Sequence, residues 1–152
     1  MYSRQEAAQL RQSFWTSLGQ YMTPVPSAEG LKINWVNYKT GVKDLYFKML
    51  AEGNTARIAI VIGHSSEARR QEFFLQLQQV EHLLRDAVQE EWQWELLVQD
   101  ENNKTVSRIA SSLEGVNIYR KEDWPAMISF FKPRMIALDV FWSEVKEGFM
   151  YL

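Results

Sequence analysis

Three strand-like runs separated by very short turns constrain the fold of this chain more than any other feature. The runs cover Leu31–Tyr38, Lys43–Ala51 and Thr55–Gly63, and the turns between them contain Gly41 and Gly53. Parallel neighbours would need a crossover of about a dozen residues or more, and these connections are much shorter. The pattern therefore predicts a three-stranded antiparallel meander.

The second and third runs differ in the spacing of their apolar residues. In the second run Leu45, Phe47 and Met49 alternate with Asp44, Tyr46 and Lys48, whereas the third contains the uninterrupted apolar stretch 58–62. Alternation is typical of a half-buried strand, and an unbroken apolar stretch is typical of an inner strand covered on both sides. We therefore expect helices on both faces of the sheet.

Helical periodicity flanks the meander. Apolar residues recur at three- and four-residue steps over 3–21, over 65–89 and from Asp123 to the chain end, with Pro133 inside the last segment. These segments predict a first helix with a capping box at Ser3 and Glu6, a long second helix, and a long C-terminal helix kinked near Pro133. Two further strands are expected at 92–99 and 105–110.

The expected fold class is α+β, in one domain over residues 1–152, because no repeat, linker or composition shift divides the chain. Its hydrophobic content of 46% can supply a core, and its formal net charge of −2 gives no global attraction to nucleic acid or anionic membrane. The sequence lacks cysteine, a signal peptide and a membrane-spanning stretch, so we expect a cytoplasmic protein with no membrane association.

Candidate site residues gather around the end of the third run. His64 follows that run directly, and Asp44 precedes the apolar part of the second. The functional interpretation of His64, with the serines after it, is a catalytic group, and the simpler one is a strand exit followed by a serine helix cap. His64 and His82 show no metal-ligand spacing, so we predict neither a metal site nor a cofactor.

Arg69 and Arg70 lie in the first turn of the predicted second helix, where the helix dipole disfavours positive charge. One explanation is an anion site built from helix N-terminal amides, both arginines, and Lys43 or Lys39 from the meander. The other is that these side chains are simply solvated. Trp35, Tyr38 and Tyr46 near basic residues of the sheet would suit base stacking if exposed, or packing against a helix if not.

Four strings resemble a known family: residues 11–15 (RQSFW), 33–47 (INWVNYKTGVKDLYF), 115–125 (GVNIYRKEDWP) and 141–146 (FWSEVK). Together they resemble the bacterial domain-of-unknown-function 4268 family over essentially the whole chain. That resemblance implies no established activity, substrate or catalytic residue.

The predicted order of elements also resembles, more distantly, the restriction-endonuclease-like (PD-(D/E)XK) fold. That fold implies an acid on the second strand of its meander and an acid-x-lysine pair on the third, which together hold a divalent metal. Asp44 matches the first acid, but the third run from Arg57 to His64 has neither a carboxylate nor a lysine. The catalytic motif is therefore not intact.

These observations favour a non-catalytic interaction domain over an enzyme, with nucleic acid, another anion or a protein as partner. One alternative is an atypical nuclease in which Asp44 binds magnesium together with Glu6 or Glu67, and another is a small-ligand-binding domain with an aromatic pocket. The many large apolar residues of the C-terminal helix would also allow a homodimer through that helix.

Overall fold

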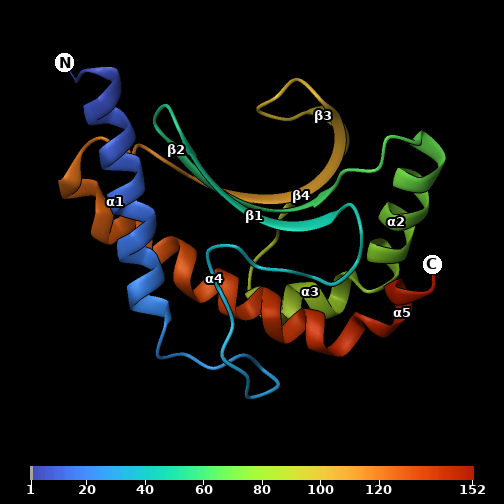
Figure 1. Ribbon diagram of the computed structural model, residues 1–152. Coiled ribbons are helices and arrows are strands. Elements are labelled where there is room, and N and C mark those ends of the chain that lie inside the picture. The colour runs from blue at the N-terminus through green and yellow to red at the C-terminus, as the bar shows by residue number, and fades with distance from the viewer. Residues whose placement is uncertain (1) are drawn as a thin grey trace.

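The computed structural model describes residues 2–152 as a four-stranded antiparallel sheet with helices packed against one face (Figure 1). The sheet order is β1-β2-β4-β3, and the α+β class is confirmed. None of the described helices is long and apolar enough to cross a membrane. In chain order the elements are α1 (Arg4–Met22), β1 (Leu45–Glu52), β2 (Thr55–Ile62), α2 (Glu67–Gln79), α3 (Glu81–Val88), β3 (Gln93–Gln99), β4 (Thr105–Glu114), the 3-10 turn η1 (Lys121–Asp123), α4 (Trp124–Val145) and α5 (Glu147–Met150).

The predicted first strand of the meander is wrong, because Leu31–Tyr38 forms a loop and only β1 and β2 pair. The reason lies in two aromatic side chains three residues apart. Trp35 donates from Nε1 to the Val25 carbonyl, Tyr38 donates its hydroxyl to Asp139 of α4 at 2.6 Å, and their ring centroids lie 6.2 Å apart. A strand would point positions three apart to opposite faces, so these anchors exclude one.

The apolar stretch of β2 is buried on both sides, as predicted. Ile58, Ile60 and Ile62 lie fully buried under the helices, while Ala59 and Val61 on the other face form a small cluster with β4. The expectation of helices on both faces is wrong, however. The sheet is strongly curved, and β3 with its turn into β4 rises over the second face instead (Figure 1). We call this concave second face the open face.

The long helix predicted over 65–89 is divided at Val80 into α2 and α3. The break lets the two halves pack against different layers, since α2 contacts β2 and β4 whereas α3 contacts α4. Leu77 and Leu84, one in each half, are both buried as a result. Serine capping is confirmed at both predicted starts, because Ser3 with Glu6 forms a capping box and Ser66 accepts from the Arg69 amide.

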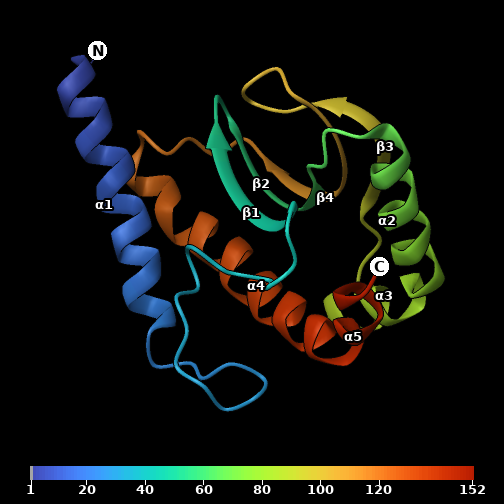
Figure 2. The ribbon, with the colours of Figure 1, turned by 45° about the vertical axis from the view of Figure 1, so that its right-hand side comes forward.

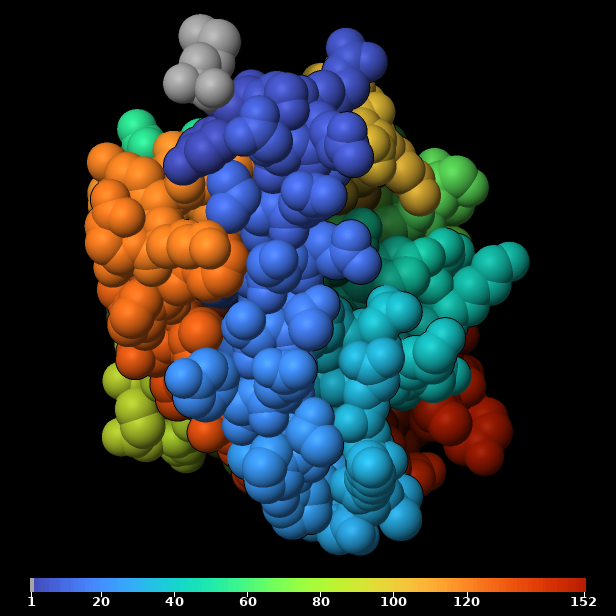
Figure 3. All heavy atoms as spheres, turned by 60° about the vertical axis from the view of Figure 1, so that its left-hand side comes forward, coloured from blue at the N-terminus to red at the C-terminus, as the bar shows by residue number. Residues whose placement is uncertain are grey.

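The core lies between the sheet and α4, which runs beneath β1 and β2 and includes Pro133. α1 lies along one side of the molecule, between the segment that follows β4 and the loop that precedes β1 (Figure 3). At the other end the chain terminus lies beside α2 (Figures 1 and 2). Trp142 of α4 donates from Nε1 to the Thr40 carbonyl at 2.9 Å, and the Thr40 hydroxyl donates to the Leu45 carbonyl, so α4 fixes the start of β1.

Candidate functional site

Four of the predicted site residues line one hollow where β1 begins and β2 ends. Lys43, Asp44, His64 and Arg69 come from the residues before β1, the exit of β2 and the first turn of α2. We call this space, of about 410 Å³, the His64 hollow. Its other walls are Gly41, Val42, Phe73, Phe149, Met150 and Leu152.

A sharp backbone turn holds Asp44 at this place. Asp44 has a left-handed conformation with φ of 64°, which aspartate tolerates better than most residues. Its carbonyl accepts from the Gly63 amide at 2.7 Å, and its carboxylate accepts from the Tyr46 hydroxyl at 3.4 Å. A Cβ at Gly63 would lie 3.3 Å from the Tyr46 ring, so glycine allows this close approach.

His64 is the buried polar group of the hollow, with 9% of its surface exposed. Its ring centroid lies 4.4 Å from that of Phe73, and within residues 2–152 its Nδ1 has no hydrogen-bond partner. Burial lowers the pKa of this imidazole, and the nearby Asp44 charge opposes that shift. Burial therefore favours the neutral imidazole, and one buried nitrogen is left unsatisfied among the described residues.

The two cations of the hollow are held differently. The Arg69 guanidinium pairs with Glu72, donates to the Leu152 carbonyl at 3.0 Å and lies 5.2 Å from the Phe73 ring centroid. Lys43 is exposed, and no carboxylate of the described chain lies within salt-bridge distance of it. Arg69 is thus a positioned charge, whereas Lys43 is an exposed charge without a carboxylate nearby in the described chain.

Two of the predicted anion-binding residues lie elsewhere. Arg70 is 8% exposed and donates to the carbonyls of His64 and Ser65 at 2.8 and 3.1 Å, which makes it a brace beneath the hollow. Lys39 lines a different depression beside Asp139 and Trp142. The sequence suggested one site from both arginines with Lys43 or Lys39, because it could not show that Arg70 turns inward or that Lys39 lies apart from the others.

The acids proposed to help Asp44 bind a metal do not gather around it. Glu6 caps α1 with Ser3, and Glu67 lies within hydrogen-bond reach of Gln71 on the surface of α2. Across residues 2–152 no three His, Asp or Glu side chains are grouped so that they could hold a metal ion. Glu6 and Glu67 therefore do not supply the additional ligands that the nuclease alternative assigned to them.

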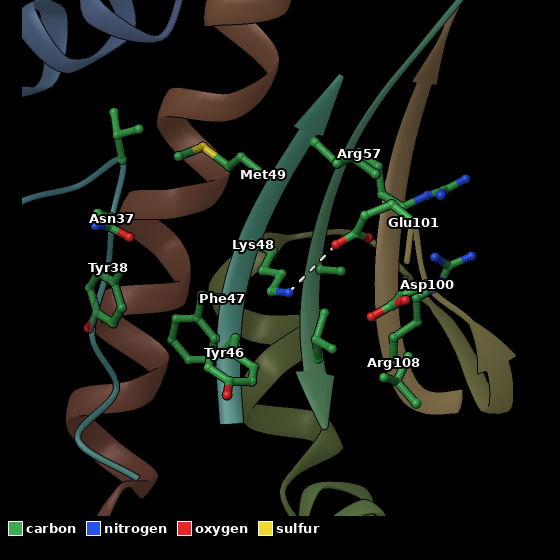
Figure 4. A pocket seen from close by; sticks show the side chains of 15 residues that line it. Asn37, Tyr38, Tyr46, Phe47, Lys48, Met49, Arg57, Asp100, Glu101 and Arg108 are labelled. Carbon is green, nitrogen blue, oxygen red and sulfur yellow. Dashed lines mark ion pairs between the residues drawn. The ribbon is translucent and has the colours of Figure 1, made fainter. Parts of the chain in front are cut away.

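A second cavity, of about 240 Å³, lies on the open face between the Val36–Tyr38 loop and the turn that joins β3 to β4 (Figure 4). We call it the open-face cavity. Lys48 of β1 pairs with Glu101 of that turn at 3.7 Å, and Arg57 of β2 donates from Nε to Ser112 at 3.2 Å. The remaining cation, Arg108 of β4, is neutralised by Glu95 at 2.9 Å.

The sequence did not predict this cavity, because the pairing register of β2 with β4 cannot be read from the sequence. Pairing places Ala59 opposite Ala110, and the small Ala59 side chain lines the cavity between the longer side chains of Lys48 and Arg57. Of the three aromatic residues considered for stacking, only Tyr46 is exposed, at 40%. Trp35 is buried, and burial beside Asp139 raises the pKa of the Tyr38 hydroxyl far above its usual value.

Comparison with known proteins identifies the family. Residues 10–146 match the domain of unknown function DUF4268. An uncharacterized protein of Methanocaldococcus jannaschii is 40% identical over 53 residues, which make up 35% of this chain and 12% of that relative. No solved structure matches the chain. Because the family match covers nearly the whole sequence, as the four strings indicated, this chain belongs to the DUF4268 family.

Proposed function

We propose that this domain is a non-catalytic interaction domain that binds an anionic group of its partner in the His64 hollow. The observation that carries the proposal is the convergence of Lys43, His64 and Arg69 from three separate segments on one accessible hollow. The partner would present a phosphate, sulfate or carboxylate group, as nucleic acids and many proteins do.

The chemistry of the lining supports an anion. Lys43 has no carboxylate of the described chain within salt-bridge distance, and Arg69 offers a guanidinium held against Phe73. The hollow also adjoins the N-terminus of α2, where the helix dipole attracts negative charge. An anion beside these groups would offset the cost of placing arginines in the first turn of that helix.

Substitution of Asp44 distinguishes this proposal from the nuclease alternative. As a carboxylate in the same hollow, Asp44 repels an anion, so Asp44→Asn is expected to increase anion affinity. Asparagine also tolerates the left-handed conformation of this position, so the fold is retained. If Asp44 instead held a catalytic metal, the same substitution would abolish activity.

The test is a titration with sodium sulfate, whose charge does not change near neutral pH, followed by NMR of backbone amides and the His64 imidazole. Lys43→Gln is expected to weaken sulfate binding about fivefold, equivalent to ~1 kcal/mol for one exposed charge contact. Lys39→Gln is the matched control, because Lys39 is an exposed lysine outside the hollow. It is expected to leave sulfate binding unchanged.

Two results would count against the proposal. The first is equal weakening by Lys43→Gln and Lys39→Gln, which would mean that sulfate responds only to overall charge. The second is cleavage of DNA or RNA with magnesium or manganese by the native protein and none by Asp44→Asn, which would favour the nuclease alternative.

A further inference from the structure

The outer edge of β1 presents backbone groups that none of the strands within residues 2–152 uses. The Gly63 amide donates to the Asp44 carbonyl, and these positions are in register, so Tyr46, Lys48 and Leu50 carry the bonds to β2. The alternate residues therefore point their N–H and C=O groups away from the sheet. The Leu45 amide confirms this direction, since it donates outward to the Val42 carbonyl.

Beyond Leu45 the outward backbone groups of β1 have no hydrogen-bond partner in the described chain. In the part of the chain that the structure describes, the backbone groups of Phe47, Met49 and Ala51 form no hydrogen bond outside the sheet. Tyr38 stacks on the Phe47 ring with centroids 5.2 Å apart, so that end is covered. Met49 and Ala51 are the positions at which a further strand could pair.

The open-face cavity lies along this edge, and its lining contains three cations, Lys48, Arg57 and Arg108, together with the carboxylates of Asp100 and Glu101. Its lining runs from the Val36–Tyr38 loop across Lys48 and Met49 to Arg57 (Figure 4). No carboxylate among residues 2–152 lies within salt-bridge distance of Arg57. The Glu101 carboxylate, 3.7 Å from Lys48, shows that an acidic side chain already fits above these strands.

We propose that β1 and the open-face cavity bind an extended acidic peptide segment of a partner protein. The peptide backbone pairs with Met49 and Ala51, and one of its acidic side chains reaches Arg57 and Lys48 and displaces Glu101. This proposal uses none of the charges of the His64 hollow, so it does not depend on the anion site proposed above.

A peptide fits this surface better than single-stranded nucleic acid does. Nucleic acid has no backbone amides that could pair with the outward groups of β1, and its bases would need exposed aromatic faces. The exposed aromatic ring of the cavity, Tyr46, has the Lys48 ammonium 5.1 Å from its centroid. The free edge and the unpaired Arg57 together match an acidic strand.

The experiment measures binding of short capped peptides to the full chain by NMR titration. The probe alternates Glu and Val, and two matched peptides carry either Lys in place of Glu or N-methyl groups at alternate backbone amides. The Glu peptide is expected to bind and to shift the resonances of Met49 and Ala51. The other two are expected to bind at least about tenfold more weakly, because each lacks either the charge or the pairing.

Protein variants locate the charge contact. Arg57→Gln is expected to weaken binding of the Glu peptide about tenfold, and Glu101→Gln to strengthen it by removing the internal competitor. Arg85→Gln, at an exposed ion pair on α3 outside both the open-face cavity and the His64 hollow, is the control and is expected to leave peptide binding unchanged. Equal binding of the N-methylated peptide, tighter binding of a single-stranded oligothymidylate to the same residues, or no binding of the Glu peptide at millimolar concentration would overturn the proposal.

Discussion

The two faces of the sheet differ in what their side chains contact. On the covered face Ile58, Ile60 and Ile109 are completely buried against the helices. On the open face the same strands carry the small side chains of Ala59 and Ala110, which are almost as buried, and Ala59 lies among the charged residues that line the open-face cavity. Adjacent residues of one strand thus have different surroundings. We infer that the covered face supplies stability, while the open face is available for binding.

The largest expected effect is a difference in unfolding free energy between substitutions at two neighbouring residues of β2, one on each face of the sheet. Ile60→Ala is expected to lower the free energy of unfolding by about 2–5 kcal/mol, because it leaves a cavity in the main core. Val61→Ala, on the open face, is expected to cost about 1–2 kcal/mol for the two carbons removed. Urea denaturation of both variants measures the difference. Equal costs would mean that the open face contributes to stability as much as the covered face does.

An intermediate effect concerns His64, at the point where β2 leaves the sheet. Burial lowers the pKa of its imidazole in the folded state, whereas the unfolded chain titrates near 6.5. As pH falls below about 7, the unfolded state therefore takes up a proton that the folded state does not, and stability decreases. The loss ends once folded His64 is also protonated.

Urea denaturation between pH 7.5 and 5 checks this pH dependence. The His64→Gln variant is expected to lose stability less steeply than the native protein over that interval, because it lacks the titrating group. NMR titration of the His64 imidazole follows this group directly. A steeper decline in the variant would contradict the assigned direction of the shift.

Local pattern predicted most of the secondary structure, because the helix caps, the β1–β2 hairpin and the apolar stretch of β2 depend on nearby residues. The failures depend on distant ones. Tyr38 leaves the strand pattern because its hydroxyl reaches Asp139, which lies 101 positions away. Arg70 and Arg69 are neighbours of the same type, and only the folded chain shows that one supports the hollow from within and the other lines it. Whether they bind anions stays a prediction.

The smallest expected effect concerns the ion pair between Lys48 and Glu101, which joins the two sides of the open-face cavity. Both side chains are partly exposed, at 42% and 26%, and their charged atoms lie 3.7 Å apart. Water and salt screen such a pair, so a double-mutant cycle with Lys48→Gln and Glu101→Gln is expected to give a coupling of about 0.2–0.5 kcal/mol.

The same double-mutant cycle, repeated at high salt, tests whether this ion pair holds the turn between β3 and β4 against β1. Screening is expected to remove the coupling, because the pair is near the surface. A contact this weak permits the turn between β3 and β4 to release Lys48 when a competing carboxylate arrives. A coupling well above about 1 kcal/mol that persists in salt would instead mean that the turn is clamped to β1, and that the open face, like the covered one, is held together for stability.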